Sequence, residues 1–287
     1  MPALQLGQEC YTCLLKLIDL TVTLATAEPL LQAQARHAAR AVLETEFSPG
    51  AIPAVIANRF HQVIKSLTGQ ADPFHAKKNQ ETALAGDIVA LLQEKRSADP
   101  SWLLALAAAG NALDFFRSQA DIAQDMLSQI TFRDSHLETW WACLHDGAGL
   151  LLYLADNAGE QFFDLPLVQF LRTSGWQVYY VVKGGPIQND LTREDLLASG
   201  LMAALEPVLD TGAETVGLEL ALVTPEFQDL FQRADLILAK GMGHFETLAH
   251  LADPRLFFLL QAKCLPVAAA LAVPRGSFVL RQAGRID

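Results

Sequence analysis

The stretch GLLLYLADNAGEQFFD, residues 149–164, decides how this chain folds. A short apolar run over residues 149–155 ends abruptly at Asp156 and Asn157, and a glycine, Glu160 and a new apolar segment follow. An apolar run of this length bounded by turn-forming residues is typical of a buried strand. The polar residues at its end form either an ordinary turn or a binding site, and the rest of the sequence has to distinguish the two.

Similar apolar runs alternate with helical segments after residue 148. We expect strands over residues 149–155, 176–182, 206–210, 235–239 and 266–272, and helices near 164–173, 192–200, 225–233 and 254–262. Strands that alternate with helices form βαβ units, in which helices cover both faces of the sheet. The sequence therefore predicts an α/β fold with a three-layer α/β/α core and a largely parallel sheet.

The part of the chain before residue 148 has helical spacing throughout. We expect helices over residues 10–27, 29–47, 52–67 and 77–95, and a further one that begins at Asp99-Pro100 and carries residues 103–116. That last segment is apolar on nearly all sides, which indicates a buried helix. We therefore expect an N-terminal helical region over residues 1–97 and the α/β/α core over residues 98–287.

Composition excludes several classes of partner. The 287 residues carry a formal net charge of -11, which argues against a nucleic acid or an anionic membrane as the main partner. No apolar run is long enough to span a membrane, and the first ten residues lack the pattern of a signal peptide. Four cysteines do not form a disulfide scaffold in a chain of this length, so we expect a reducing, cytoplasmic setting.

Polar residues follow three of the expected strands. In chain order they are Asp156, Asn157, Glu160, Asp190, Lys240 and His244, and Gly241 and Met242 lie between the last two. Ligands of an open parallel sheet bind beyond the carboxyl ends of its strands, so we expect these residues to meet at one edge. Taken singly, Asp156-Asn157 could be a turn, and the segment from Asn189 to Thr192 could be a helix N-cap.

The chemistry of these residues suits phosphoryl transfer to water. Asp156, Asn157 and Asp190 offer only oxygen ligands, which Mg²⁺ and Mn²⁺ prefer. Lys240 precedes a glycine and a helix start, and with the N–H groups of Gly241 and Met242 it could bind a phosphate. A divalent cation polarises phosphoryl oxygens and lowers the pKa of an attacking water.

Motifs along nearly the whole chain resemble one known family. They are CYTC (10–13), ADPFHAKKNQ (71–80), AAGNALDF (108–115), YLADNAGEQFFD (153–164), KGGPIQNDLTREDL (183–196), ADLILAKGMGHFETL (234–248) and AKCLPVAAALAVPRGSFVL (262–280). The chain resembles the metal-dependent damage-control phosphatases, first described as domain of unknown function 89 and also called acidic-residue-methyltransferase-1-like. It looks closest to the prokaryotic branch that has an N-terminal CxxC.

This resemblance implies a function and a set of site residues. Asp156, Asn157 and Asp190 fall on the family's metal ligands, and Lys240 and Gly241 on its phosphate-binding motif. Further active-site positions fall on Asn111 and Asp114. The implied activity is hydrolysis of small phosphate monoesters, such as damaged or side-product sugar phosphates or nucleotides. Mn²⁺, Co²⁺ or Ni²⁺ would support it, and Mg²⁺ is a further candidate.

Several roles stay open at this point. Asp114 or Glu160 could orient the attacking water, and Asn111 could steady the substrate or the water shell of the metal. His244 stands where the family usually has Asn, and it could contact phosphate or metal, or only the helix start.

Residues outside the main constellation have weaker assignments. Cys10 and Cys13 could bind a soft metal or form a redox pair, with Cys264 or Cys143 as a partner, or could be small buried thiols. Lys78 and Asn79 could line the cleft from the helical side.

Two alternative functions remain open. One is a non-catalytic protein that binds a phosphorylated metabolite. The other is an S-adenosylmethionine-dependent protein carboxyl methyltransferase, although the chain has no glycine-rich nucleotide fingerprint. The sequence does not indicate an oligomeric state.

Overall fold

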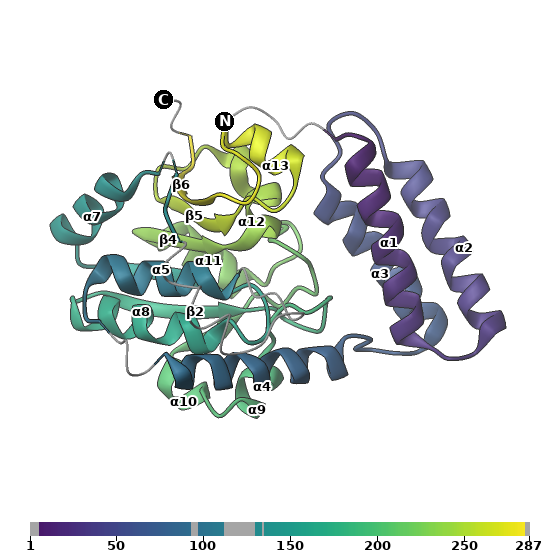
Figure 1. Ribbon diagram of the computed structural model, residues 1–287, viewed down its shortest axis with the longest axis horizontal. Helices are drawn as coiled ribbons and strands as arrows, with labels where there is room; N and C mark the ends of the chain where they lie inside the picture. Colours follow the sequence, from purple (N-terminus) through teal and green to yellow (C-terminus); the bar gives the residue numbers. More distant parts are fainter. Residues whose placement is uncertain (1–5, 93–96, 112–129, 134, 285–287) are drawn as a thin grey trace.

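A six-stranded sheet between two helical layers forms the core of the molecule (Figure 1). The computed structural model describes residues 6–92, 97–111, 130–133 and 135–284. The strands are β1 (Leu150–Leu154), β2 (Gln177–Val182), β3 (Val208–Asp210), β4 (Leu236–Lys240), β5 (Leu256–Gln261) and β6 (Phe278–Gln282). Their order is β3-β2-β1-β4-β5-β6, and only β6 is antiparallel to its neighbour. The predicted α/β/α core with a largely parallel sheet is confirmed.

The order of the strands fixes where a ligand should bind. From β1 the chain moves outward through β2 to β3, then crosses back to place β4 on the other side of β1. In such sheets the crevice beyond the carboxyl ends of the two central strands is the preferred ligand site. Leu154 pairs with Ala239, so β1 and β4 end next to each other. Asp156 and Lys240 therefore lie at this switch point.

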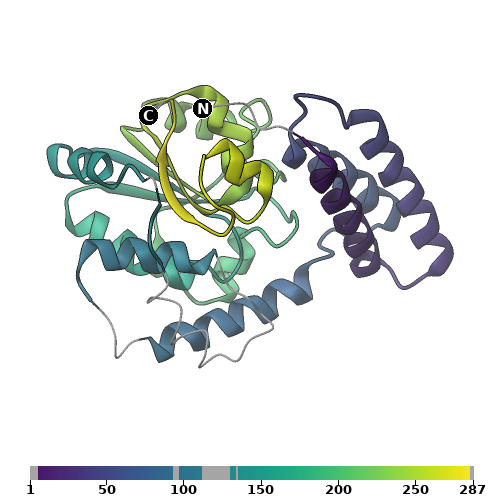
Figure 2. The ribbon, with the colours of Figure 1, turned by 45° about the horizontal axis from the view of Figure 1, so that its top comes forward.

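Helices cover both faces of the sheet because both faces of its strands are apolar (Figure 2). One core contains Leu151 and Tyr153 of β1 and lies under α5 (Pro100–Gly110), α7 (Leu137–Asp146) and α8 (Gln161–Thr173). The short helices α9 (Arg193–Ala198) and α10 (Met202–Leu205) join that face. The opposite core contains Leu152 and Leu154 and lies under α11 (Pro225–Arg233), α12 (Gly241–Leu248) and α13 (Leu265–Ala270), with a single 3-10 turn at Ala249–Leu251.

Two of the predicted elements near the C-terminus are wrong. The helix expected over residues 254–262 is strand β5, and the strand expected over 266–272 is helix α13; strand β6 was not predicted. Residues 256–261, LFFLLQ, are an apolar run whose periodicity does not separate a strand from a buried helix. Residues 265–270 begin with proline in the first turn and continue with alanines, and both features favour a helix.

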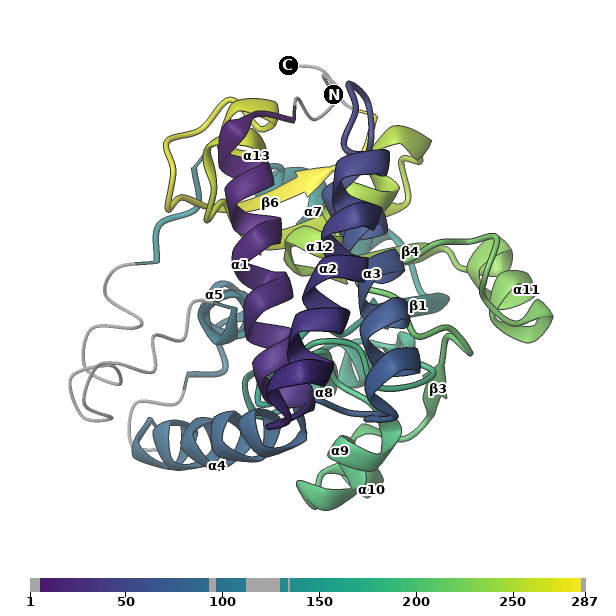
Figure 3. The same ribbon diagram turned by 90° about the vertical axis from the view of Figure 1, so that its right-hand side faces the viewer.

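The N-terminal helices α1 (Gln8–Ala25), α2 (Pro29–Glu46) and α3 (Pro53–Thr68) share an apolar core of their own. They lie together beside the core in Figure 1 and in front of it in Figure 3. Helix α4 (His75–Leu91) packs instead with α5 and α8. The division at residues 97 and 98 stays a prediction. Among the described residues, no helix combines the length and the apolar character needed to cross a membrane.

Polar contacts hold α3 against the core. Asn58 accepts a hydrogen bond from the N–H of Val216 at 2.7 Å and donates one to Glu219 at 2.7 Å. Glu246 of α12 accepts a hydrogen bond from the N–H of Ala54, in the first turn of α3, at 3.0 Å. Burial raises the pKa of Glu246 to about 7, although the N–H of Ala54 favours the ionised form.

This carboxyl group predicts a pH dependence of stability. Because the pKa of Glu246 is higher in the folded chain than its ordinary value of 4.5, the folded state binds the proton more tightly. Its contribution to the free energy of unfolding therefore falls as pH rises from about 4.5 to about 7. Glu246→Gln keeps an acceptor for the N–H of Ala54. Because the side chain is only half-buried, water screens part of the free-energy cost of ionising Glu246. We expect the variant to be more stable than the wild type by about 1–2 kcal/mol at pH 8 and by little at pH 4.5. Urea unfolding at the two pH values measures this difference, and a difference that does not change with pH would contradict the assignment.

Candidate active site

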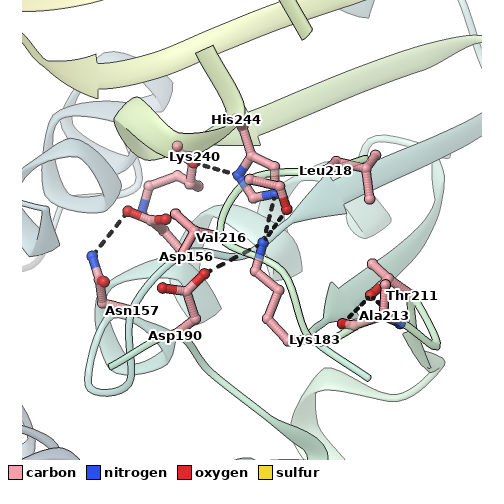
Figure 4. Close-up of polar contacts among 12 residues, drawn as sticks. Asp156, Asn157, Lys183, Asp190, Thr211, Ala213, Val216, Leu218, Lys240 and His244 are labelled. Atoms are coloured by element: carbon pink, nitrogen blue, oxygen red, sulfur yellow. Dashed lines mark hydrogen bonds and ion pairs between the residues drawn. The ribbon is translucent and has the colours of Figure 1, made fainter. Parts of the chain in front are cut away.

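Two loops at the switch point are joined to each other. Asn157, after β1, and Asp190, after β2, form an isolated antiparallel bridge. The N–H of Leu191 donates to the carbonyl of Asp156 at 2.8 Å, and that of Ala158 donates to the carbonyl of Asn189 at 2.8 Å. Because the two backbones are held together, the side chains of Asp156, Asn157 and Asp190 gather at one place (Figure 4). The three predicted metal ligands are thus brought together.

A cleft of about 240 Å³ opens over these residues, between α1 and α3 on one side and the strand ends on the other. Five of the predicted site residues line it, namely Asn111, Asp156, Asn157, Asp190 and Met242. Four others lie behind the lining and are buried, namely Glu160, Lys240, Gly241 and His244. Asp114 lies outside the described residues, so its role stays a prediction.

Two amides orient the carboxylates at the floor of the cleft. Asn111 donates through Nδ2 to Asp156 Oδ2 at 2.9 Å and to Glu160 Oε1 at 3.0 Å. Asn157 donates to the same two oxygens at 2.9 and 2.7 Å. Because its nitrogen faces two carboxylates, the amide oxygen of Asn157 points away from them. That oxygen is therefore available to a cation.

Lys240 lies in a fully buried ion-pair network. Its Nζ is 2.7 Å from Glu160 Oε2 and 2.7 Å from Asp164 Oδ1. The hydroxyls of Tyr153 and Tyr180 donate to Asp164 at 2.7 and 2.8 Å. The ammonium of Lys240 therefore forms ion pairs with carboxylates below the floor of the cleft. Its position gives no support to the predicted contact with phosphate. Both oxygens of Glu160 are likewise engaged, which favours a positioning role over contact with a water in the cleft.

Gly241 allows the close approach of β4 to Asp156. Its φ is +80°, a backbone conformation that side chains disfavour. A Cβ at this position would collide with the carboxylate of Asp156. We therefore infer that glycine is required here for space as much as for any N–H contact with a ligand.

His244 contacts a lysine that sequence reasoning did not select. Its Nδ1 lies 2.6 Å from the carbonyl oxygen of Lys240, and its Nε2 lies 3.2 Å from Nζ of Lys183. Burial and the charge of Lys183 lower the pKa of His244 well below its ordinary value, so the ring is neutral. Nδ1 then donates to the carbonyl, and Nε2 accepts from the ammonium. Lys183 also donates to the carbonyl of Gly217 at 2.6 Å and lies 3.4 Å from Asp190 Oδ2.

The placement of Lys183 could have been found from the sequence. It directly follows strand β2, and Lys240 is the last residue of β4. The other predicted positions differ: Lys78 is buried in ion pairs with Asp72 and Asp195, and Asn79 is exposed and bonded to His75. Neither lines the cleft.

Comparison with known proteins places the chain in a family. The model of the damage-control phosphatase ARMT1-like domain matches residues 7–279. The chain belongs to this family. A damage-control phosphatase of Pyrococcus horikoshii is 36% identical over 94% of this chain and 96% of its own. One of Archaeoglobus fulgidus is 28% identical over 95% and 97%. A crystal structure of a DUF89 family protein of P. horikoshii has a TM-score of 0.89 and 34% identity, covering 97% of this chain and 99% of its own.

Membership of the damage-control phosphatase family confirms the predicted family and makes the chain a phosphatase. The names of these relatives give no support to the methyltransferase or to the non-catalytic binding protein. The placement in a CxxC-containing branch stays a prediction. Cys10 is buried, Cys13 is exposed and lines the cleft, and all four cysteines are free.

Charge is unbalanced at the phosphatase site. Among the described residues, four carboxyl groups, of Asp156, Glu160, Asp164 and Asp190, are buried here beside two ammonium groups, of Lys183 and Lys240. When all are ionised, these side chains carry two net negative charges. Burying such an excess is costly unless another cation balances it. One divalent cation would supply the missing charge.

The pKa values reflect the same excess of negative charge. Burial, with the charges of Glu160 and Asp190, raises the pKa of Asp156 well above its ordinary value. Burial raises that of Asp190 to about 6, although Lys183 opposes the shift. Burial also disfavours the ionised form of Glu160, but Lys240 and the hydrogen bonds outweigh it and leave the pKa lowered. The two carboxyls beside the cleft are therefore the ones that a cation would stabilise in their ionised form.

The donor set fits a hard cation. Asp190 Oδ2 is buried, no described residue donates a hydrogen bond to it, and it lies 3.4 Å from the Lys183 ammonium. In the described part of the chain, no three His, Cys, Asp or Glu side chains are grouped as a metal site. The fit therefore depends on the amide oxygen of Asn157 as the third ligand, beside the two aspartates.

The contact between His244 and Lys183 can be tested by substitution. His244→Asn keeps an acceptor and a donor of amide type, so we expect it to retain most of the activity. His244→Leu removes the acceptor for Lys183 and should lower kcat/KM about 10- to 100-fold, which is typical for loss of a group that orients a metal ligand. The affinity for Mn²⁺ should fall in parallel. Equal activity of the wild type and His244→Leu would show that this contact does not act through Asp190.

Proposed function

We propose that this phosphatase depends on a divalent cation held by Asp156, Asn157 and Asp190. The observation that carries the proposal is the surplus of two buried carboxyl groups over ammonium groups, among the described residues, where two joined loops meet at the switch point. Mn²⁺, Co²⁺ or Ni²⁺ are the proposed ions, with Mg²⁺ as a further candidate. When bound, such an ion polarises the phosphoryl oxygens and lowers the pKa of the attacking water.

The surrounding residues have proposed supporting roles. Asn111 and Glu160 hold Asn157 and Asp156 in the orientation that presents their free oxygens. Lys183, fixed by His244, holds Asp190. We propose small phosphorylated metabolites as substrates, including damaged or side-product sugar phosphates and nucleotides. We also propose a cytoplasmic location and no nucleic-acid partner, in keeping with the net charge of -11.

Lys263 is the proposed partner of the phosphoryl group, in place of Lys240. It follows β5 and is exposed, and no other lysine or arginine of the described residues lines the cleft. Its positive charge lies close enough to favour ionisation of Asp156. An ammonium at the mouth of the cleft can donate to a phosphoryl oxygen while the floor holds the cation.

Substitution of Lys263 tests this role. A hydrogen bond to a charged group contributes about 1.5–3 kcal/mol, so Lys263→Met should lower kcat/KM about 10- to 100-fold. Lys263→Arg keeps the charge and should lose less. Lys16→Met makes the same change on the exposed face of α1, outside the cleft, and should leave kcat/KM as in the wild type. An unchanged kcat/KM in Lys263→Met would reject the role.

Metal dependence can be tested on the unmodified chain. Protein treated with a chelator and dialysed should not hydrolyse p-nitrophenyl phosphate, and added Mn²⁺, Co²⁺, Ni²⁺ or Mg²⁺ should restore turnover. Full turnover by the metal-free protein would reject the proposed cation. Binding of a phosphorylated ligand without turnover under any metal would instead favour the binding protein, and transfer of a labelled methyl group from S-adenosylmethionine would favour the methyltransferase.

A further inference from the structure

Helix α12 brings a further carboxyl group to the cleft, that of Glu246. Glu246 lines the cleft together with Met242 and Gly243, because residues three and four positions apart share one face of a helix. Its carboxyl group is neither one of the proposed metal ligands nor one of the groups that orient them. Its presence in the lining therefore needs an explanation of its own.

Glu246 lies at the end of the cleft away from the proposed cation. Gly241, the first residue of α12, lies against the carboxylate of Asp156. A helix rises about 1.5 Å per residue, so Glu246 follows about 7.5 Å farther along the helix axis. There it accepts a hydrogen bond from the N–H of Ala54 in α3, on the opposite side of the cleft from the strand ends. Glu246 is therefore placed to meet the organic group of a bound ester and not its phosphoryl group.

One oxygen of this carboxyl group is available to a ligand. Oε2 accepts the hydrogen bond from Ala54 at 3.0 Å, whereas none of the described residues donates to Oε1. Burial raises the pKa of Glu246 to about 7, and only the N–H of Ala54, with no lysine or arginine of the described chain, opposes this rise. A half-buried carboxylate of this kind gains from a further hydrogen-bond donor. A hydroxyl of the substrate is such a donor.

The contact with α3 explains only part of this arrangement. Ile52, the N-cap residue of α3, has no side chain that could accept a hydrogen bond, so Glu246 accepts one from the first turn in its place. That contact uses a single oxygen. A neutral acceptor would serve it equally well, without the cost of a partly buried charge. The second oxygen and the charge therefore point to an additional role in the cleft.

We propose that Glu246 is a specificity-determining residue, which accepts hydrogen bonds from hydroxyls on the organic group of the substrate. The proposal rests on the proposed function, because it assumes that the phosphoryl group binds over Asp156 and Asp190. It favours esters of polyols, such as sugar phosphates and nucleotides, over esters of the same shape without hydroxyls. A site built to bind a hydroxyl rejects the analogue that lacks it, because the buried polar group is then left without a partner.

Two pairs of matched esters test this selection at pH 8, where Glu246 is largely ionised. Glucose 6-phosphate is paired with cyclohexylmethyl phosphate, and ribose 5-phosphate with cyclopentylmethyl phosphate. Each sugar ester thus has a partner with the same ring size and no hydroxyls. With Mn²⁺ we expect kcat/KM to be about 10- to 100-fold higher for the sugar ester in at least one pair, which is the size of effect that one hydrogen bond to a charged group produces.

The same measurements separate the inference from the proposed function. Lack of a preference for the sugar ester in both pairs would overturn the inference. The proposed function would stand in that case, provided that the protein hydrolyses p-nitrophenyl phosphate with Mn²⁺. Failure to hydrolyse p-nitrophenyl phosphate or any of the four esters would overturn both.

Two substitutions of Glu246 assign the preference to this side chain. Glu246→Leu removes the acceptor and should lower the ratio of the two kcat/KM values within the selective pair about 10- to 100-fold. Glu246→Gln keeps a neutral hydrogen-bonding group and should lower the ratio less, about 5- to 10-fold, which covers the case in which Glu246→Leu does not fold. An unchanged ratio in either folded variant would overturn the inference.

A control variant distinguishes this contact from a displacement of α3, since Glu246 also holds Ala54. Lys65 of α3 donates to the carbonyl of Pro186 at 2.9 Å and forms an ion pair with Glu214, and none of these three residues lines the cleft. Lys65→Met therefore loosens α3 without changing the lining, and it should leave the ratio as in the wild type. An equal fall of the ratio in Lys65→Met and Glu246→Leu would assign the effect to the position of α3 and overturn the inference.

Discussion

Asp156→Asn is expected to lower kcat/KM for p-nitrophenyl phosphate by on the order of 10³-fold or more, because it removes an anionic ligand of the proposed cation. Asn has nearly the shape of Asp, so its amide oxygen can accept the hydrogen bond from Asn111. The variant side chain carries no charge that has to be buried. Burial and the carboxylates of Glu160 and Asp190 raise the pKa of Asp156. Keeping this carboxyl group ionised at pH 8 therefore destabilises the metal-free folded state. We therefore expect the metal-free variant to be at least as stable as the metal-free wild type at pH 8.

The change of Tm on adding Mn²⁺ distinguishes loss of a metal ligand from a general loss of structure in Asp156→Asn. Mn²⁺ should raise the Tm of the wild type, because a ligand that binds only the folded state stabilises it. It should raise that of Asp156→Asn much less. Asp229→Asn is the matched control, because Asp229 is exposed and its ion pair with Arg233 lies on the surface. An equal rise of Tm in Asp156→Asn and in the wild type would place the cation elsewhere.

Lys240→Met is expected to destabilise the folded chain by about 3–5 kcal/mol, because it leaves buried carboxylates without their cation. The side chain of Lys240 is fully buried, and its ammonium contacts Glu160 and Asp164, each at 2.7 Å. Methionine has a similar length and no charge, so the change removes the ion pair with little change of volume. Urea unfolding at pH 8 measures the loss.

A second substitution distinguishes the ion pair from simple packing. Glu160→Gln removes one of the two uncompensated charges, so the double variant should be less destabilised than the sum of the two single variants. If Lys240 instead bound the phosphate of the substrate, Lys240→Met would raise KM and leave the free energy of unfolding nearly unchanged. That second pattern would restore the role expected from the sequence.

The course of the chain through the first four strands was predictable because each ends in a polar residue or a turn. Asp156 and Lys240 mark the ends of β1 and β4, and the rule for parallel sheets brings them to one edge. Near the C-terminus the same reasoning failed, since LFFLLQ and PVAAALA are both short apolar runs. Pairing with β4 and β6, which is a tertiary contact, makes the first of them a strand.

Sequence reasoning could bring together the residues that we propose as metal ligands, but it could not decide which lysine faces the cleft. Lys183 follows β2, Lys240 ends β4 and Lys263 follows β5, but the sequence predicted a helix where β5 lies and so did not bring Lys263 to this edge. The three lysines differ in burial: Lys183 and Lys240 are buried among carboxylates, whereas Lys263 is exposed. The burial of Lys240 depends on where α8 places Glu160 and Asp164, and the spacing of residues along the chain does not specify this. The same limit applies to His244, whose partner Lys183 comes from another strand.

Diffraction from crystals grown with Mn²⁺ tests the central claim most directly. An anomalous difference map should show one strong peak within about 2.0–2.6 Å of carboxylate oxygens of both Asp156 and Asp190 and of the amide oxygen of Asn157. A strong peak bound by other residues, in a protein that hydrolyses phosphate esters only with Mn²⁺, would contradict the account.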